Sequence, residues 1–475
     1  MNCLRVWGGG IYEKDIFYQL CDRLGIIVWQ DFMFACALYP VTENFLSNVK
    51  EEIEYQIKRL QHYTCIGIWC GNNENFGTLT WFPESRNNRD RYLVDYDRLY
   101  QGLIGKTVKS LDPNRLWWPS SPCAGPDDFA DNWHQDNKGD MHYWAVWHEK
   151  KNFSAYLDIK PRFVSEFGYE SFPSINCIKT YATEEDLNFT SPVNEYHQRS
   201  PSGNSLMLES FARYFRFPNS FENQVYLSQV QQSVAMRTAI DWWRSLEPYC
   251  MGTLVWQLND VWPGPSWSSI DYLGNWKLLH YVQKDAFKPG HLAHYQKDDY
   301  YGLTMINDSF STVSIDVKIS FYKFDGTKAA PSITKATTIK SGTTKQIYKA
   351  TCNTKKLKKN EYFVYAEFNA VSEKGQKYNG STTIFPDLYK HCEFVKPEIK
   401  FIVREYKNGY EIEIKSHRPA FFVSLSTEGL KGHFSENCIT LLSGVKQKLL
   451  FTPEQKCTLS EIKKSLSIKH LQQTY

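Results

Sequence analysis

Residues 66–75, IGIWCGNNEN, pass from an apolar run into a segment of glycine, amides and one carboxylate, Glu74. Residues 162–168, RFVSEFG, repeat this pattern around Glu166. An apolar strand that ends in a polar segment is typical of parallel α/β folds, in which the carboxyl ends of the strands carry the functional groups. We therefore expect both glutamates to lie at the same end of a parallel sheet.

The first 290 residues show short β-branched or aromatic runs that alternate with segments of helical period, which predicts βα units and a parallel sheet. The predicted strands cover residues 3–7, 26–32, 65–70, 115–120, 142–146, 162–168 and 253–258, and the predicted helices cover residues 42–62, 95–110 and 225–246. Because the sequence contains no glycine-rich phosphate-binding loop, this pattern favours a (β/α)8 barrel of the TIM type over a doubly wound sheet.

The predicted barrel spans residues 1–290 and is one strand short of the eight that closure requires. The chain opens inside a strand, so we expect an N-terminally truncated barrel that lacks its first strand. Such a barrel exposes backbone donors and acceptors along the two flanking strands. We therefore expect this polypeptide alone to be poorly stable and weakly active or inactive.

The pattern changes after residue 290. Apolar and polar residues alternate from Val313 to Phe321, which predicts a strand with one face in water, and a further strand is predicted over residues 361–368. Asn408-Gly409 predicts a tight hairpin turn between strands at 401–406 and 410–415. We expect one or two small antiparallel β-sandwich domains, at residues 296–388 and, as an immunoglobulin-like domain, at residues 393–475.

The composition excludes several classes of partner. The 55 Lys and Arg residues nearly balance the 52 Asp and Glu residues, so neither nucleic acid nor a membrane surface is expected, and residues 355–359, KKLKK, predict a solvated loop. No apolar run is long enough to span a bilayer, and the first eight residues lack the regions of a signal peptide. Asn-x-Ser/Thr triplets at Asn152, Asn188, Asn307 and Asn379 permit a glycoprotein without demonstrating one.

Two carboxylates that face each other across the mouth of a barrel can perform glycoside hydrolysis, one as proton donor and one as nucleophile or base. The alternative is that Glu74 and Glu166 are paired polar groups at strand ends without a catalytic role. His134, His142 and His148 do not form a His-Glu-x-x-His pattern, so no metal site is expected, and neither a nucleophile-elbow motif nor a P-loop motif is found.

Four segments carry a family resemblance: residues 4–10 (LRVWGGG), 28–34 (VWQDFMF), 69–74 (WCGNNE) and 164–168 (VSEFG). Together they resemble the β-mannosidases of glycoside hydrolase family 2, most of all the lysosomal β-mannosidases of animals. The likeness extends through most of the first 290 residues, and it implies a C-terminal portion that lacks the N-terminal domains of that family. It also implies a retaining exo-hydrolase that releases β-linked mannose from oligosaccharides in N-glycan catabolism, with no cofactor and no metal.

The resemblance implies a role for individual residues. Glu74 would be the acid/base, Glu166 the nucleophile, and Asn73 a hydrogen-bond partner of the sugar 2-hydroxyl. Arg5 would keep Glu166 ionised, Asp31 would accept hydroxyl hydrogens, and Trp7 and Trp256 would stack on the terminal sugar. Less closely matched positions, also assigned to substrate binding, are Trp81, Trp133, Tyr143 and Trp147.

Each of these positions also has a structural interpretation. Trp7 and Trp256 could fill the barrel core, Asp31 could cap a helix or turn, and Arg5 could pair with any buried acid. For the chain as a whole, the alternatives are another family 2 exo-glycosidase (a β-galactosidase, β-glucuronidase or exo-β-glucosaminidase) and an inactive, truncated carbohydrate-binding product. The oligomeric state stays open.

Overall fold

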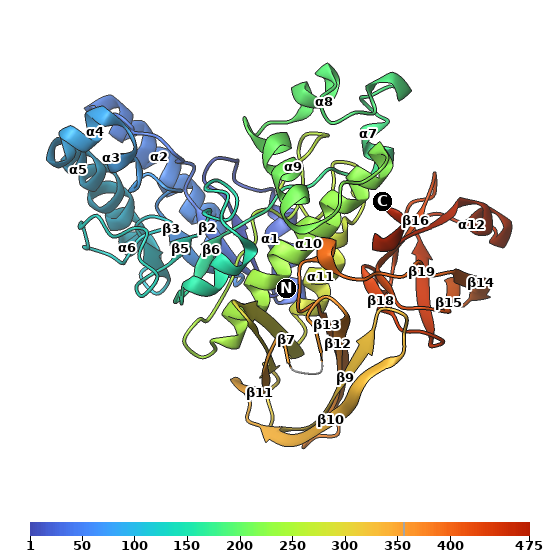
Figure 1. Cartoon of the computed structure of the whole chain (residues 1–475). Helices are drawn as coiled ribbons and strands as arrows, with labels where there is room; N and C mark the ends of the chain where they lie inside the picture. Colours follow the sequence, from blue (N-terminus) through green and yellow to red (C-terminus); the bar gives the residue numbers. More distant parts are fainter. Residues whose placement is uncertain (355–356) are drawn as a thin grey trace. The chain divides into compact units, whose positions relative to one another are not determined.

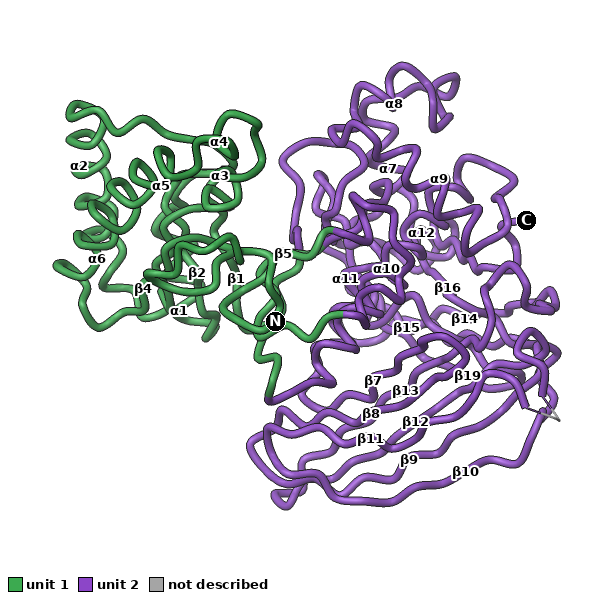
Figure 2. The backbone as a smooth tube through the Cα atoms, turned by 60° about the vertical axis from the view of Figure 1, so that its left-hand side comes forward, with its two compact units in different colours: residues 1–144, 159–167, 249–255 green, residues 145–158, 168–248, 256–475 purple. Residues whose placement is uncertain are grey.

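The computed structural model describes residues 1–354 and 357–475. The chain divides into two compact units, coloured separately in Figure 2. Unit 1 comprises residues 1–144, 159–167 and 249–255, and unit 2 comprises residues 145–158, 168–248 and 256–475. Lys355 and Lys356, part of the predicted solvated loop, lie outside the described residues.

Unit 1 is built on a parallel sheet with the strand order β1 (Cys3–Val6), β2 (Ile27–Asp31), β3 (Ile66–Cys70) and β4 (Leu116–Trp118). The helices that connect these strands are α1 (Asp15–Leu24), α2 (Glu43–Leu60), α3 (Thr78–Trp81), α4 (Pro83–Asn87), α5 (Arg89–Asp97), the wider-turned η1 (Arg98–Gly105) and α6 (Lys106–Leu111) (Figure 1). The predicted parallel α/β arrangement is confirmed.

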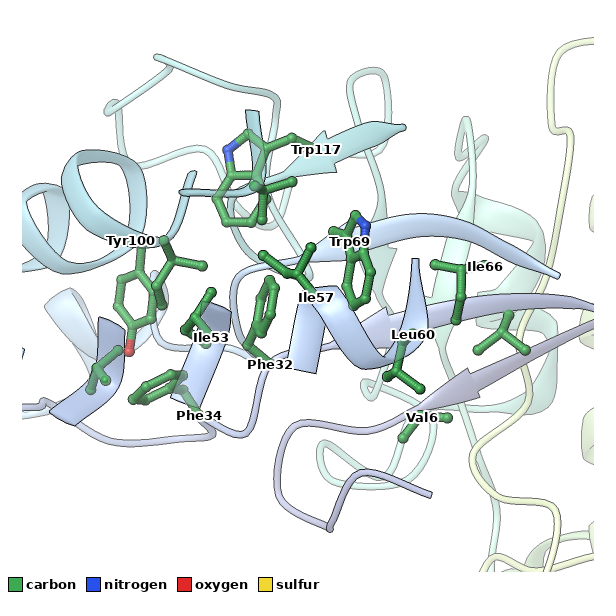
Figure 3. Packing of buried hydrophobic residues seen from close by; sticks show 14 of the residues in the cluster. Val6, Phe32, Phe34, Ile53, Ile57, Leu60, Ile66, Trp69, Tyr100 and Trp117 are labelled. Carbon is green, nitrogen blue, oxygen red and sulfur yellow. The ribbon is translucent and has the colours of Figure 1, made fainter. Parts of the chain in front are cut away.

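Helix α2 illustrates how the sequence positions this sheet. Thr42 caps the helix by accepting a hydrogen bond from the backbone N–H of Phe45, and Ile53, Ile57 and Leu60 recur at helical spacing on its buried face. These side chains join one apolar core with the strand residue Trp69, as Figure 3 shows. Core packing therefore fixes the strands whose carboxyl ends carry polar residues.

Two further short strands complete the parallel pairing in unit 1. Strand β5 (Met141–His142) pairs in parallel with β6 (Val164–Glu166), and Val164 forms a parallel bridge with Thr253. The predicted strand over 253–258 is wrong beyond this bridge, because the backbone N–H of Gln257 donates to the carbonyl of Trp267 instead of to a neighbouring strand. The backbone amide of Leu254 still donates to Val164.

Unit 2 begins with helices. They are η2 (Phe153–Asp158), α7 (Ile175–Ile178), η3 (Glu184–Asp186), α8 (Pro192–His197), α9 (Gly203–Tyr214), α10 (Phe221–Ser245) and α11 (Leu278–Ala286). Helix α10 covers the segment predicted to be helical at 225–246 except for its last residue, Leu246, and many of its side chains are buried.

Antiparallel sheets follow in unit 2. The first set consists of a sheet ordered β11-β8-β7 and a sheet ordered β10-β9-β12-β13; its strands are β7 (Gly290–Lys297), β8 (Tyr300–Asn307), β9 (Val313–Lys323), β10 (Lys328–Ile339), β11 (Thr343–Thr351), β12 (Tyr362–Ser372) and β13 (Lys377–Ile384). Alternate residues of β9, from Val313 to Ile319, are buried in the core of this sandwich, as the sequence predicts. A short helix, η4 (Tyr389–His391), follows β13.

The second set of sheets is ordered β14-β15-β19-β17 and β18-β16-β20. Its elements are β14 (Ile399–Tyr406), β15 (Gly409–Ser416), β16 (Ala420–Thr427), β17 (Gly432–Phe434), β18 (Ile439–Leu441), β19 (Lys446–Pro453), α12 (Leu459–Ser465), β20 (Leu466–Lys469) and η5 (Leu471–Gln473). The apolar residues between these sheets form one core cluster.

The predicted hairpin forms, but its turn is displaced by one residue. Tyr406 pairs with Gly409, so the loop consists of Lys407 and Asn408, and Lys407 takes the positive φ of 48°. Gly409 instead lies in the strand, where an added Cβ would meet the carbonyl oxygen of Phe451 at 2.3 Å. The glycine is therefore required for the close approach of β19 and not for the turn.

Two features of the folded chain, its helices and its glycosylation triplets, bear on the expectations from sequence. Among the described residues, no helix is both long and apolar enough to cross a membrane. Of the four glycosylation triplets, the one at Asn307 is buried, and its amide donates to the carbonyls of Ser311 and Ile339. Asn307 is therefore closed to modification in the folded chain.

Two buried titratable side chains, Glu170 and Lys277, lie among the loops of unit 2. Glu170 is fully buried and accepts a hydrogen bond from the amide of Gln198, while Lys277 donates to the carbonyls of Ser171 and Ser266. Burial raises the pKa of Glu170 to about 8, against the opposing effects of Gln198 and Lys277. Burial also lowers the pKa of Lys277 to about 8.

The raised pKa of Glu170 predicts that its contribution to the free energy of unfolding depends on pH. A carboxyl whose folded pKa exceeds its unfolded value stabilises the fold at low pH and loses that contribution as the pH rises toward about 8. We expect Glu170→Gln, which mimics the protonated acid, to gain stability over the wild type by up to about 1.4 kcal/mol per pH unit above pH 5. Urea denaturation at pH 5 and pH 8 measures the difference. Glu195→Gln, at an exposed position on α8, is the control, and an equal difference at both pH values for Glu170→Gln would contradict the expectation.

Candidate active site

Glu74 lies just beyond β3, where the parallel pairing continues as isolated bridges. Asn73 bridges to both Ala35 and Ser121, and the backbone N–H of Glu74 donates to the carbonyl of Ser121 at 2.7 Å. Glu74 itself has a positive φ of 61°, which is uncommon for a residue with a Cβ and costs about 1–3 kcal/mol. The surrounding backbone hydrogen bonds therefore hold the main chain of Glu74 in a conformation that this residue would not adopt alone.

Glu166 ends β6 and is 5% exposed. Its carbonyl accepts a hydrogen bond from the backbone N–H of Tyr143, which follows β5 directly. One oxygen of its carboxylate, Oε1, accepts a hydrogen bond from Nη1 of Arg5 at 2.7 Å. The strand end and the arginine together fix the direction of this side chain.

Arg5, on β1, connects three groups of the site. Its Nη2 atom donates to Oδ2 of Asp31 at 2.7 Å and to Oδ1 of Asn73 at 2.8 Å, in addition to the bond from Nη1 to Glu166. Burial alone would lower the pKa of Arg5, but the charges of Asp31 and Glu166 outweigh it, so the pKa lies above its usual range. The guanidinium is thus a permanent cation among buried acceptors.

Asp31 ends β2 and is fully buried. Besides Arg5, it accepts hydrogen bonds from the indole Nε1 of Trp29 at 2.9 Å and from the backbone N–H of Gly8 at 3.0 Å. A Cβ on Gly8 would lie 2.5 Å from the carbonyl oxygen of Phe34, so only glycine allows this approach. The structure makes Asp31 an anchor for Arg5, and its expected contact with a sugar hydroxyl stays a prediction.

His142, the last residue of β5, touches both glutamates. Its Nδ1 atom lies 2.7 Å from Oε1 of Glu74 and 3.3 Å from Oε2 of Glu166. From sequence, His142 was considered only as a metal ligand, so its contact with the two glutamates was missed. The predicted strand over residues 142–146 begins at His142, whereas β5 ends there, in register with Glu166.

Cys36 contacts the other oxygen of Glu74, at 3.4 Å from its Sγ to Oε2, and accepts a hydrogen bond from Nδ2 of Asn73. Burial and the nearby charge of Glu74 raise the pKa of this thiol to about 12, so it stays protonated and donates. Cys36 was also missed, because a single cysteine in a loop carries no spacing pattern.

The site's electrostatics place a proton between Glu74 and His142. Burial alone would raise the pKa of Glu74, but the hydrogen bond and charge of His142, followed by the hydrogen bond from Cys36, lower it below its usual value. Burial alone would lower the pKa of His142, but the charge of Glu166 and the contact with Glu74 raise it. The pKa of Glu166 is raised by burial and by the charge of Glu74, against the opposing effects of His142 and Arg5.

Glu74, His142 and Glu166 each place one nitrogen or oxygen atom within 4.8 Å of the others, a set that resembles metal ligands. The chemistry of the donor set does not fit a resident cation, because the guanidinium of Arg5 already occupies Glu166 and would repel a second positive charge. The same atoms are well placed to share a proton and to hold two carboxylates side by side.

The remaining predicted residues are divided between the units. Trp7 follows β1 and is half-buried, with its indole over Gly9, and Tyr143 is buried next to His142. Trp147 and Trp256 belong to unit 2, where Trp147 is buried against Tyr169 and Trp267. In unit 1 the structure thus brings together Arg5, Asp31, Asn73, Glu74 and Glu166, and the sugar contacts of the aromatic residues stay predictions.

Comparisons with known proteins identify relatives of the whole chain. A β-mannosidase of Capra hircus is 32% identical over 507 residues, covering 100% of this chain and 56% of the relative, and β-mannosidase B of Emericella nidulans is 35% identical over 60% of this chain and 35% of its own length. The chain spans about half the length of the animal relatives it matches. A crystal structure of the β-D-mannosidase of Dictyoglomus thermophilum superimposes with a TM-score of 0.88 at 31% identity, covering 99% of this chain and 56% of that one.

Two family models match the antiparallel part of unit 2. The model described as a Mannosidase Ig/CBM-like domain covers residues 301–391, and an Ig-fold domain model covers residues 394–474. The exo-chitosanase of Amycolatopsis orientalis shares the fold, with a TM-score of 0.71 at 16% identity over 99% of this chain and 59% of its own. The fold is a mixed α/β region with a parallel sheet, followed by antiparallel immunoglobulin-like β-sandwich domains.

The likeness to these relatives makes the chain a homologue of glycoside hydrolases. More particularly, the chain is a homologue of the β-mannosidases of glycoside hydrolase family 2, and the resemblance drawn from the sequence motifs is confirmed.

Removing Arg5 should destabilise unit 1 strongly. Its side chain is 6% exposed and offsets two buried carboxylates, and breaking a buried ion pair from one side costs about 3–5 kcal/mol. We expect Arg5→Met to lower the free energy of unfolding by an amount in that range, measured by urea denaturation at pH 7. Arg59→Met is the matched control, since Arg59 pairs with the half-exposed Asp15 and its loss should cost less than about 1 kcal/mol. Equal losses for the two variants would contradict the assigned role of Arg5.

Proposed function

We propose that this protein is a retaining exo-β-mannosidase that hydrolyses terminal, non-reducing β-D-mannose residues from oligosaccharides. The observation that carries the proposal is the juxtaposition of Glu74 and Glu166, with one atom of each lying within 4.8 Å of a nitrogen of His142 and within 4.8 Å of each other. The frame that we propose for this site is a (β/α)8 barrel, of which the parallel strands of unit 1 form a part. Glycoprotein catabolism in the lysosome is the proposed setting, by homology to the animal enzymes.

The close spacing of the carboxylates supports a double displacement. Retaining glycosidases hold their two carboxyl groups about 5–5.5 Å apart, whereas inverting enzymes need about 6.5–9.5 Å to admit a water molecule. In the proposed mechanism, Glu166 attacks the anomeric carbon while Glu74 protonates the glycosidic oxygen. Glu74 then removes a proton from water, whose oxygen displaces Glu166 and regenerates its carboxylate.

The hydrogen-bond partners of the two glutamates support this division of roles, against the pKa directions of the free site, which are lowered for Glu74 and raised for Glu166. Glu166 accepts a hydrogen bond from Arg5, a cation that stabilises the ionised form that a nucleophile requires. Glu74 instead faces His142, a group that exchanges protons near neutral pH. Asn73, whose Oδ1 atom is held by Arg5, is placed beside Glu74 to contact the sugar 2-hydroxyl.

The choice of mannose rests on the relatives, whose printed names are β-mannosidases across animals, fungi and a bacterium. We propose that Trp7 and Tyr143, both in unit 1, contribute apolar surface on which a terminal sugar stacks. Trp7 and Tyr143 neighbour the charged groups in the sequence, at the ends of β1 and β5. No cofactor is proposed, because the side chains themselves supply the acid, base and nucleophile.

Glu166→Ala should lower kcat for an aryl β-mannoside by at least about 10³-fold, because no group then forms the glycosyl-enzyme. Azide, a small external nucleophile that fits the vacated space, should restore product as the α-mannosyl azide, whose anomeric configuration is inverted. Product analysis by NMR gives the configuration. Glu149→Ala, at an exposed position, is the control, and a folded Glu166→Ala variant that azide does not rescue would count against the nucleophile assignment.

Sugar specificity follows from a side-by-side comparison. We expect the value of kcat/KM to be highest for the 4-nitrophenyl β-mannoside among four aryl glycosides, namely the β-mannoside, β-galactoside, β-glucuronide and β-glucosaminide. Because the four values of kcat/KM are compared with one another, the test works even when all four are low. Preference for any of the other three sugars replaces the proposed substrate by that sugar while leaving the hydrolytic mechanism in place.

A further inference from the structure

Behind His142 lies a second layer of buried polar groups that the proposed reaction does not use directly. The Nε2 atom of His142, on the far side of the ring from Glu74, lies 3.0 Å from Oγ of Ser121. Ser121 in turn lies 2.7 Å from Oδ2 of Asp140. All three residues are buried, so water does not compete for these contacts.

Asp140 can only accept in this network. Its Oδ1 atom receives the indole N–H of Trp118 at 2.8 Å and the backbone N–H of Cys123 at 3.0 Å, groups that always donate. Its Oδ2 atom receives the hydroxyls of Ser121 and Ser165 at 2.7 and 2.5 Å. Four donors thus point at this one carboxylate, which leaves it no neighbour in the network to which it could donate.

The direction of the hydrogen bonds then determines the tautomer of His142. A hydroxyl has one proton, and Ser121 gives that proton to Asp140. Toward His142, the oxygen of Ser121 can therefore only accept, so the Nε2 atom carries a hydrogen. Any further proton on this ring lies on Nδ1, 2.7 Å from Oε1 of Glu74.

Ser121 is also held rigidly by its backbone. Its N–H donates to the carbonyl of Asn72 at 2.9 Å, and its carbonyl accepts from the N–H of Glu74 at 2.7 Å. One residue thus contacts the backbone of Glu74 and the imidazole that contacts the carboxylate of Glu74. A shift of Ser121 moves both.

We propose that Ser121 and Asp140 are positioning residues that keep a proton on Nε2 of His142, so that Nδ1 and Glu74 share the one proton that the reaction transfers. This inference rests on the proposed glycosidase function for its catalytic consequence and on the hydrogen-bond network alone for the tautomer.

The proton balance is complete in both half-reactions. When the glycosidic bond breaks, the one shared proton passes from Nδ1 of His142 through Glu74 to the leaving oxygen, which leaves Glu74 as a carboxylate and His142 as a neutral imidazole protonated on Nε2. When water attacks the glycosyl-enzyme, Glu74 takes the proton from water and can return it to Nδ1, while Glu166 leaves as a carboxylate. The ring never needs to change its Nε2–H bond.

The charged groups around His142 set the sign of the expected effect. Glu74 and Glu166 face Nδ1, Arg5 lies beyond Glu166, and Asp140 acts on Nε2 through Ser121. The two glutamates and Asp140 favour a proton on the ring, and Arg5 opposes it. Substituting Asp140 or Ser121 should therefore lower the pH at which the Glu74–His142 pair loses its shared proton.

The first arm of the test is the pH profile of kcat/KM of the full chain on the aryl β-mannoside. The alkaline limb reports loss of the proton shared by the Glu74–His142 pair. We expect Ser121→Ala and Asp140→Asn to move this limb about one pH unit lower, and Ser121→Thr, which keeps the hydroxyl, to restore it. Ser165→Ala is the matched control, since Ser165 also donates to Asp140 but lies outside the path to His142, and its limb should stay in place.

The second arm does not need activity. Nitrogen chemical shifts of ¹⁵N-histidine-labelled chain report which ring nitrogen is protonated, and the signal missing from His142→Gln identifies His142. The wild type should keep Nε2 protonated throughout the titration, whereas Ser121→Ala should show a mixture of tautomers when neutral. If Asp140→Asn fails to fold, Ser121→Ala decides alone.

The two arms separate the possible failures. A wild-type chain that hydrolyses none of the four glycosides contradicts the proposed function, and the NMR titration still decides the tautomer. A Ser121→Ala variant whose His142 keeps the wild-type tautomer and titration overturns the inference. A variant that loses rate equally at every pH, with the alkaline limb unmoved, overturns it as well, because that is the result of a purely structural role.

Discussion

The structure of the site depends on one cation, the guanidinium of Arg5. Arg5 lies on the first strand, β1, and pairs with carboxylates at the ends of two other strands. Asp31 at the end of β2 and Glu166 at the end of β6 both need a positive partner to remain charged without water. Because Arg5 also holds the amide of Asn73, three separate segments are fixed by one planar group. The geometry of the paired glutamates follows from this constraint, since the backbone of Glu74 continues directly from Asn73.

From Arg5 the hydrogen bonds run through the site in a continuous order. Asn73 accepts a hydrogen bond from Arg5 and donates one to Cys36. Cys36 and His142 each contact the carboxylate of Glu74. The other ring nitrogen of His142 contacts Ser121, which donates to Asp140. A permanent cation stands at one end and a carboxylate with four donors at the other. The Glu74–His142 pair lies between these two ends and holds the proton that the proposed reaction transfers. Buried networks of this kind specify one arrangement because each partly satisfied alternative is costly.

The sequence predicted the sheet of unit 1 well, because buried parallel strands and amphipathic helices such as α2 leave distinct periodicities. It also predicted Arg5, Asn73, Glu74 and Glu166 as neighbours, through motifs that matched a known family. It failed where long-range contacts decide the outcome. Residues 254–258 are apolar enough for a strand, yet Gln257 pairs with Trp267, and Gly409 serves a close approach instead of a turn. His142 and Cys36 went unassigned because their importance lies in their contact with Glu74, which is 68 residues from His142 and 38 from Cys36 in the sequence.

The left-handed backbone at Glu74 has an evolutionary consequence. Glycine and asparagine adopt that conformation more readily than glutamate does, so drift at this codon toward either would relax the local fold while removing the carboxylate. Selection for a well-folded chain and selection for chemistry therefore pull residue 74 in opposite directions. Among divergent copies of such a gene, loss of the acid at this position would leave a soundly folded chain, and a glutamate retained there would support the catalytic role proposed for it.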